Sequence, residues 1–490
     1  MLFNSLHFII FFIIIATVYY LVPGRYKLIL LLISSLYFYM SWNVSYGILL
    51  GISILSVYVT TILISGSKDR FVKKCLLIMC EAVNLSMLFL FKYFNFFNDN
   101  LTALLGFVSI DYGFQGLDII LPIGISFYTF MALSYLIDVY RGDVEPERKL
   151  SIFALYMSFF PHLVAGPIMR AKELIPQFYE EHAFDLKNIN FGILLMLWGF
   201  FKKIVVADRL ALYVNPAYND VMHQDGFTLA IATIFFAFQI YCDFSGYCDI
   251  AMGCALFLGY RLPENFRTPY FSTSIIEFWR RWHITLYNWL RDYVYIPLGG
   301  NRVSKTRYYM NILIIFMLSG LWHGANWTFV AWGLLLGIFV IMNIILNDAL
   351  KNLKPELSDL LECKWATGAA GALVTFVVVD FCWIFFRANS IGDAFQILRI
   401  MATDAVAYLL SFNPANALVP LYSGQSSLLL LPLLAILATL VIEYANTRVS
   451  LLEYVSGRPM AARWAVYYVL VFLVLLAGVF GSNYFIYFQF

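Results

Sequence analysis

The chain has 490 residues, of which 62% are hydrophobic and only 13% are charged. This leaves too little polar surface to cover a water-soluble globule of that size. The formal net charge of +2 is too small to indicate a nucleic-acid partner. The seven cysteines show neither a disulfide framework nor a Cys/His spacing of the zinc type, so we expect no disulfide scaffold and no bound metal. The composition predicts a protein embedded in membrane lipid.

Apolar runs along the chain set the expected fold. Several are nearly uncharged and reach the roughly 20 residues that a helix needs to cross about 30 Å of hydrocarbon, which favours helices over a membrane barrel. We therefore predict an all-α polytopic membrane protein with about eleven or twelve crossings. The first run lacks the flanks of a signal peptide and is expected to remain as a span. The expected spans are 6–22, 27–42, 44–65, 74–97, 118–140, 188–207, 227–259, 308–322, 327–347, 370–386, 428–444 and 464–488.

Basic residues predict how these spans are oriented. They cluster on alternate loops, at 25–27, 68–74 and 141–149, whereas the loop 98–117 contains no Lys or Arg. Because cytoplasmic loops are enriched in Lys and Arg, we expect the N-terminus and the loop 98–117 to lie outside, and the C-terminus as well. The alternation of inner and outer loops is kept only if the segment 151–169, which two prolines and a glycine interrupt, is re-entrant, entering and leaving the membrane on the cytoplasmic side. Such broken backbone is tolerated only where protein or a water-filled cavity surrounds it.

The run 227–259 is too long for one crossing and carries polar groups in its middle. Asp243 and Asp249 lie six positions apart around Ser245 and Gly246, so we predict a break in the helix there. Buried carboxylates need partners. Two interpretations remain open: pairing with arginines or backbone amides, or a polar lining to a substrate path.

The region 261–307 is the most basic part of the chain, and by the same rule it faces the cytoplasm. Within it, the string IEFWRRWHITLYNWLRDY places Phe278, Trp282, Leu286 and Trp289 on one face of a helix. This pattern predicts a helix that lies in the membrane interface.

His323 occupies the most informative position among the six histidines. It lies in GLWHGANW between two apolar runs, about 15 residues beyond Tyr308, which corresponds to about 22 Å of helix. An ionisable residue at that depth indicates a functional site by default, and the flanking Gly320 and Gly324 allow close approach. The structural alternative is a neutral histidine that is hydrogen-bonded between helices. His283, at the inner interface, and His162, beside Pro161, look structural when each is taken alone.

A deep, neutral imidazole suits acyl transfer, because it can accept the proton of an attacking hydroxyl as a general base. A thioester donor such as acetyl-CoA carries phosphates, which would give the basic region a ligand. Two alternatives belong to other classes. In a transporter or flippase His323 would relay protons, and in a membrane scaffold it would be dispensable.

Seven ordered strings carry a resemblance to the AlgI-type branch of the membrane-bound O-acyltransferase (MBOAT) family. They are LPIGISFYTF, YLIDVYRGD, FFPHLVAGPIMR, YCDFSGYCDIAMG, PENFRTPY, EFWRRWHITLYNWLRDYVYIPLGGNR and LSGLWHGANWTFVAWG. The similarity extends from the N-terminus to about residue 345 and more loosely to the end. The branch includes alginate, peptidoglycan and cellulose O-acetyltransferases and, more distantly, D-alanyl transfer proteins.

The resemblance implies that His323 is the catalytic histidine and that His283 is the second characteristic histidine, near the cytoplasmic mouth of a central tunnel. It implies acetyl transfer from a cytoplasmic donor, without a permanent cofactor, to an exported polysaccharide in a bacterial inner membrane. It also implies an extracytoplasmic partner with an SGNH hydrolase-like domain. The residues expected to line the tunnel or to contact the substrate are Trp322, Gly324, Asn326, Asp243, Ser245, Asp249, Trp282, Arg280 and Arg281.

We expect one membrane domain over residues 1–490. Its parts would be a first set of spans at 6–260, the cytoplasmic basic platform at 261–307, the helices of the catalytic histidine at 308–347, and the C-terminal spans at 348–490.

Overall fold

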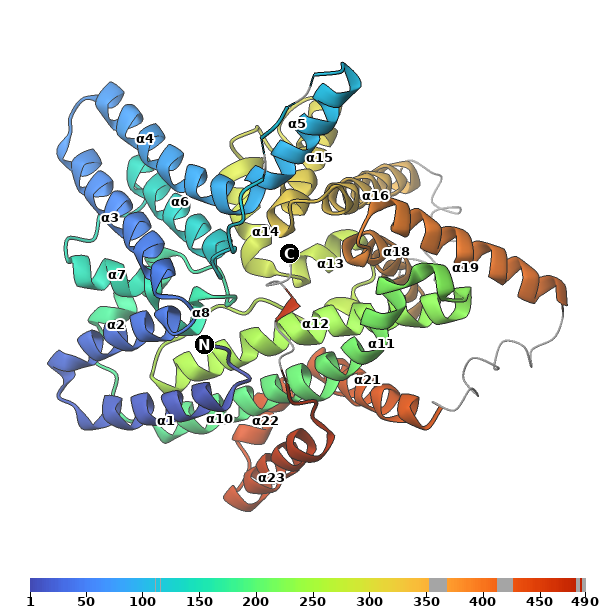
Figure 1. The fold of residues 1–490 in the computed structure, drawn as a ribbon. Helices are drawn as coiled ribbons and strands as arrows, with labels where there is room; N and C mark the ends of the chain where they lie inside the picture. Colours follow the sequence, from blue (N-terminus) through green and yellow to red (C-terminus); the bar gives the residue numbers. More distant parts are fainter. Residues whose placement is uncertain (111, 115, 352–367, 412–425, 482–484, 487–490) are drawn as a thin grey trace. The chain divides into compact units, whose positions relative to one another are not determined.

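The computed structural model in Figure 1 describes residues 1–110, 112–114, 116–351, 368–411, 426–481 and 485–486. Within these ranges every regular element is a helix, so the predicted all-helical fold is confirmed. The chain divides into two compact units. The first unit comprises Met1–Met196 and Cys248–Glu264, and the second comprises Leu197–Tyr247 and Asn265–Phe490.

Seven helices in the described part of the chain are long and apolar enough to cross a membrane. The chain is therefore a multi-pass membrane protein. The other predicted spans coincide with helices that are shorter or carry more polar residues, such as α1, α2, α6, α15 and α21. The seven are Val44–Gly66, Arg70–Phe107, Leu186–Asn219, Gly226–Phe257, Trp327–Ala349, Ala369–Arg387 and Met460–Ala477.

The first unit is built mainly from helices that follow one another in the sequence. In it α3 packs against both α4 and α6, and α2 packs against α7. Side chains begin several of these helices; the Asp69 carboxylate, for example, accepts the Phe71 amide at the start of α4. The elements are α1 (Leu6–Leu21), α2 (Gly24–Met40), α3 (Val44–Gly66), α4 (Arg70–Leu88), η1 (Phe89–Tyr93), α5 (Phe94–Phe107), α6 (Ile125–Arg141), α7 (Leu150–Ser158), α8 (Phe160–Leu163), α9 (Ala171–Leu174), η2 (Pro176–Tyr179) and α10 (Leu186–Phe200), which continues into the second unit.

The segment 151–169 is interrupted in the structure. Helix α7 ends at Ser158, and the short α8 begins at Phe160 beyond a non-helical Phe159. The residues on both sides of the interruption are buried within the unit, which is the environment that broken backbone requires. Whether the segment enters and leaves on one membrane face stays a prediction.

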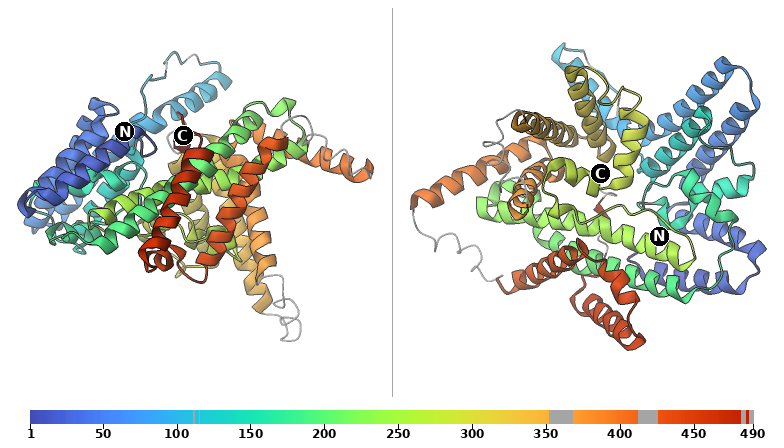
Figure 2. Two further views of the ribbon diagram at one scale, coloured as in Figure 1. Left: turned by 90° about the horizontal axis from the view of Figure 1, so that it is seen from below. Right: turned by 180° about the vertical axis from the view of Figure 1, so that it is seen from behind.

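The second unit contains the two histidines of the sequence motifs. In it α15 packs against α16, the next helix in the chain, to form a hairpin (Figures 1 and 2). The elements are η3 (Phe201–Ala207), α11 (Asp208–Asn219), η4 (Val221–His223), α12 (Gly226–Phe257, shared with the first unit), η5 (Pro269–Phe271), α13 (Ile275–Arg281), α14 (Ile284–Leu290), η6 (Arg291–Tyr295), α15 (Lys305–His323), α16 (Trp327–Lys351), α18 (Ala369–Arg387), α19 (Ile391–Ser411), α21 (Ser426–Asn446), α22 (Leu451–Ser456) and α23 (Met460–Ala477).

The break predicted in the run 227–259 is wrong, because α12 is one continuous helix over 32 residues. The carboxylate of Asp243 does not disrupt the helix, since it lies 2.7 Å from the Lys203 ammonium and accepts the Ile486 amide at 2.8 Å. Lys203 also lies 2.8 Å from Asp208. Asp243 therefore pairs with a lysine and a backbone amide instead of an arginine of the basic platform.

The single interfacial helix predicted around Trp282 is also wrong. The chain forms two short helices, α13 and α14, separated by Trp282 and His283. The apolar residues of the predicted face, Phe278, Trp282, Leu286 and Trp289, are all buried within the protein instead of lying in lipid. The last predicted span, 464–488, likewise ends early, because α23 stops at Ala477.

Candidate active site

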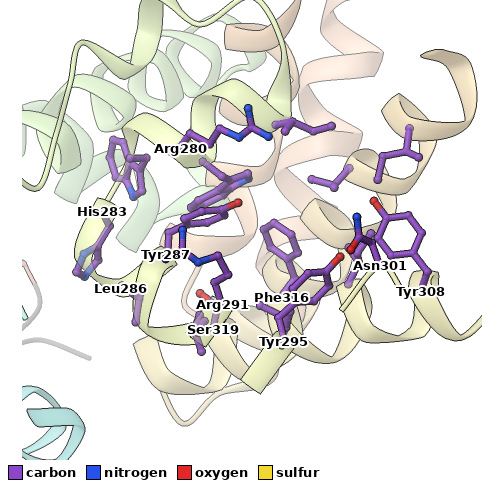
Figure 3. Close-up of a pocket in the computed structure, with 18 of the residues that line it drawn as sticks. Arg280, His283, Leu286, Tyr287, Arg291, Tyr295, Asn301, Tyr308, Phe316 and Ser319 are labelled. Atoms are coloured by element: carbon purple, nitrogen blue, oxygen red, sulfur yellow. The ribbon is translucent and has the colours of Figure 1, made fainter. Parts of the chain in front are cut away.

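A cavity of about 360 Å³ lies within the second unit (Figure 3). Both motif histidines line it. This volume is at the lower end of the range typical of small-molecule sites. The wall is formed by α13, α14, η6 and the α15–α16 hairpin. The lining residues are Ile276, Trp279, Arg280, Trp282, His283, Leu286, Tyr287, Leu290, Arg291, Tyr295, Asn301, Tyr308, Ile312, Ile315, Phe316, Ser319, His323, Val340 and Ile344.

Helix α15 positions His323. The hydroxyl of Ser304 accepts the Arg307 amide at the N-terminus of the helix, and His323 is the last helical residue. Glycines hold α15 against α16 at close range. A Cβ atom on Gly320 would lie 2.2 Å from the Phe329 carbonyl oxygen, and one on Gly333 would lie 2.2 Å from that of Phe316. No larger residue fits either position unless the backbones separate.

Aromatic rings enclose the imidazole of His323, which is only 3% exposed. The ring centroids of Trp322, Trp332 and Phe386 lie 4.9, 5.1 and 5.4 Å from its own, each in an edge-to-face arrangement. Such contacts fix the orientation of a ring, because rotation would replace favourable edge-to-face geometry with clashes. The structure thus gives His323 a defined orientation.

His283 lies at the junction of α13 and α14 in a left-handed backbone conformation, with φ +45° and ψ +54°. This conformation is uncommon outside glycine and indicates local strain, which often marks a functional position. His283 is 2% exposed, so its ring is buried within the protein. Burial lowers the pKa of His283 to about 3, which keeps the imidazole neutral at physiological pH.

The two histidines are joined through one indole ring. The Trp322 ring lies 5.7 Å from that of His283 and 4.9 Å from that of His323. The cavity wall therefore has two buried histidines near each other, contributed by different elements. Ser319, one turn before His323 on α15, faces the same cavity.

Exposed polar and cationic residues also line the cavity. Arg280, Arg291 and Asn301 are exposed, and the lining of the cavity includes no Asp or Glu among the described residues. Figure 3 places Asn301 and Tyr308 on the side of the pocket away from His283. Arg291 is bonded to Asp292 at 2.8 Å, whereas Arg280 has no carboxylate within ion-pair distance in the described chain. Such a mouth favours an anionic ligand.

Comparisons with known proteins place this cavity in a family. Residues 148–351, which include both histidines and the whole described lining, match the model of the MBOAT, membrane-bound O-acyltransferase family. The chain is 38% identical over 425 residues to a probable alginate O-acetylase AlgI of Pseudomonas aeruginosa, covering 85% of this chain and 78% of the relative. The chain belongs to the membrane-bound O-acyltransferase family.

Other relatives act on different polymers, by their names. A peptidoglycan O-acetyltransferase of Helicobacter pylori is 34% identical over 397 residues, covering 76% of this chain and 73% of the relative. A teichoic acid D-alanyltransferase of Streptococcus thermophilus is 31% identical over 283 residues, covering 54% of this chain and 68% of the relative. The chain is thus an O-acyltransferase, and the predicted resemblance is confirmed.

The structure of this O-acyltransferase brings four of the expected site residues into one cavity, namely Arg280, Trp282, His283 and His323. Arg281 does not line it and instead bonds Glu277 at 2.5 Å. Trp322 packs between the histidines without lining the cavity.

The remaining expected residues have other surroundings. Gly324 admits the Phe329 ring, which a Cβ atom would meet at 2.1 Å. The side-chain oxygen of Asn326 accepts the Thr328 amide at the start of α16. Asp243 pairs with Lys203. Ser245 is buried on α12, outside the cavity. Asp249 lies on the part of α12 that belongs to the first unit. The structural candidate His162 lies on α8, also in the first unit.

Several cavity residues of this O-acyltransferase were missed from the sequence. Ser319 could have been found, because it lies four positions before His323 and therefore on the same face of the helix. Tyr287, Tyr295 and Tyr308 come from three elements whose convergence no local pattern indicates. The same holds for Asn265, whose contact with His283 spans 18 residues.

Proposed function

We propose that this protein is an O-acetyltransferase that uses the cavity to bind an acetyl thioester, with acetyl-CoA as the donor and His323 as the general base. The observation that carries the proposal is the joint position of His283 and His323 in one cavity whose mouth is cationic. The chemistry needs a donor site that is accessible to an anionic thioester and a neutral base where the acyl group arrives.

The proposed step is the attack of an acceptor hydroxyl on the thioester carbonyl carbon. His323 takes the hydroxyl proton as the new C–O bond forms, and the C–S bond then breaks. The thiolate leaves with the bonding electron pair and recovers a proton from the imidazolium. The aromatic rings around His323 hold its imidazole in one orientation, which shortens the search for a reactive geometry.

Arg280 and Arg291 are suited to the phosphates of the donor. Arg280 is exposed and lines the cavity without a carboxylate partner in the described chain. A guanidinium binds phosphate through paired N–H groups. The basic loops lie on the cytoplasmic side under the positive-inside rule, where acetyl-CoA is available.

The acceptor side rests on the relatives. Their names point to alginate-like exopolysaccharide or peptidoglycan as the polymer that is finally acetylated. We propose that an extracytoplasmic SGNH-type partner completes that transfer. The protein would lie in the bacterial inner membrane with both termini outside.

The test is acetyl transfer from radiolabelled acetyl-CoA to polysaccharide in host membranes that carry His323→Ala. We expect a loss of about 10²–10⁴-fold, the usual contribution of a general base. The matched control is His223→Ala, because the His223 side chain is 81% exposed and should be dispensable. Transfer at the wild-type rate by His323→Ala protein of normal abundance would refute the proposed role.

A further inference from the structure

Asn265 is a fixed, buried residue beside His283. It is fully buried, and its backbone carbonyl accepts the Ile284 amide at 2.9 Å. Two residues further on, the Arg267 amide donates to the Arg281 carbonyl at 2.9 Å. These bonds join the loop that precedes η5 to the junction of α13 and α14, and they support the left-handed backbone of His283.

The side-chain oxygen of Asn265 receives three contacts. The Thr285 amide donates to Oδ1 at 3.1 Å, and the Thr285 hydroxyl donates to it at 2.9 Å. His283 Nδ1 lies 3.1 Å from the same atom. A backbone amide can only donate, so the atom that faces Thr285 must be the oxygen and not the nitrogen of the Asn265 amide.

This assignment determines the protonation of His283. A carbonyl oxygen offers only lone pairs, so a bond with Nδ1 requires that Nδ1 carry the hydrogen. The other tautomer would place two lone pairs against each other at 3.1 Å. A neutral imidazole protonated on Nδ1 has its free lone pair on Nε2.

We infer that Asn265 is a positioning residue that holds His283 as the Nδ1–H tautomer, so that His283 offers the cavity a hydrogen-bond acceptor at Nε2. The ligand group that contacts His283 must then donate a hydrogen bond, as an amide N–H in the arm of the acetyl thioester would. This inference rests on the proposed function, because it assumes that the cavity binds the thioester.

The surroundings of His283 favour the neutral form. The rings of Phe244 and Phe266 pack against it at 4.7 and 6.4 Å, and Trp322 covers it from α15. None of these rings carries a charge. Burial lowers the pKa of His283 to about 3. The titratable and charged groups that share its cavity are Arg280, Arg291, Tyr287, Tyr295, Tyr308 and His323, and all the charges among them oppose an imidazolium.

The decisive variant is Asn265→Asp, which keeps the shape and the acceptor but adds a negative charge at Nδ1. A carboxylate stabilises the imidazolium and raises the pKa of His283. Because the protonated form has no lone pair on Nε2, activity should be lost at a higher pH than in the wild type as the pH falls. We expect the acidic limb of the rate profile to move up by at least one pH unit, with near wild-type activity above it.

Two further variants separate tautomer control from structure. Asn265→Ala removes the acceptor and releases the tautomer of His283, so we expect KM for acetyl-CoA to rise at least tenfold while kcat changes less. Thr285→Val removes one donor to Oδ1 but leaves the Nδ1 contact, so its pH profile should match the wild type. Unfolding temperatures of the purified proteins in detergent are measured in parallel.

An unchanged profile in folded Asn265→Asp protein, or an unchanged KM for acetyl-CoA in Asn265→Ala, would overturn the inference. Failure of both variants to fold would also overturn it, since Asn265 would then be only structural. His323→Ala is assayed in the same membranes. If it transfers acetyl groups as fast as the wild type, or if wild-type membranes do not use acetyl-CoA, the proposed function fails independently of Asn265.

Discussion

The contact between α15 and α16 makes Gly320→Ala a sharp test of how His323 is positioned. The new Cβ atom would lie 2.2 Å from the Phe329 carbonyl oxygen, whereas ordinary contacts begin at 3.4 Å. The helices must therefore separate by about 1 Å at this point. Overpacking of this kind costs about 1–3 kcal/mol, of which the better helix propensity of alanine returns about 1 kcal/mol. Misplacement of a catalytic group by about 1 Å can reduce the rate roughly 10²-fold.

We therefore expect Gly320→Ala to lose far more acetyl transfer than stability, as measured by acetyl release from acetyl-CoA and by the unfolding temperature in detergent. Gly337→Ala on α16 is the matched control. The tightest contact of its Cβ atom would be the end of the flexible Leu313 side chain, at 3.1 Å, and the next atoms lie at ordinary contact distances of 3.4 and 3.5 Å. Activity should therefore stay within about threefold of the wild type. Wild-type activity in Gly320→Ala would refute the argument that the glycine contact sets the position of His323.

Two further predictions use matched pairs of substitutions. Arg280→Gln should raise KM for acetyl-CoA about tenfold, the equivalent of about 1.4 kcal/mol, and should weaken the salt dependence of KM. The control Arg281→Gln removes a guanidinium that bonds Glu277 outside the cavity, so it should leave KM unchanged. Equal effects of the two substitutions would contradict a site for the acetyl donor at the mouth of the cavity. Lys203→Met leaves the carboxylates of Asp208 and Asp243 buried without their shared cation, so we expect a loss of about 3–5 kcal/mol in unfolding free energy. In the control Lys305→Met, the lost ion pair is the 3.7 Å contact of Lys305, whose side chain is 81% exposed, with Asp348. This change should alter the unfolding free energy by less than about 1 kcal/mol. A similar loss in both variants would show that burial of the Lys203 cluster is not the cause.

The helices and the family could be predicted from the sequence because their signals are local. An apolar run long enough to cross the bilayer can be recognised from its own residues, and the motif strings around His283 and His323 are contiguous in the sequence. The regions where prediction failed depend on contacts between distant residues. The continuity of α12 depends on Lys203, which lies 40 residues before Asp243 and neutralises it.

The junction of α13 and α14 shows the same limit. The apolar pattern from Phe278 to Trp289 continues through it without a break, so periodicity predicts one helix. The left-handed turn at His283 instead depends on backbone and side-chain bonds from Asn265, 18 residues earlier. A strained residue of this kind departs from local preference where tertiary contacts outweigh it.

The rings around His323 also determine what cannot reach it. An acetyl thioester is an activated compound, and a base that can draw a proton from a sugar or protein hydroxyl can draw one from water equally well. The largely apolar rings of Trp322, Trp332 and Phe386 surround the imidazole, which is only 3% exposed, so little of it is open to water. Under the proposed mechanism, the packing that orients His323 would also limit the wasteful hydrolysis of the acetyl thioester.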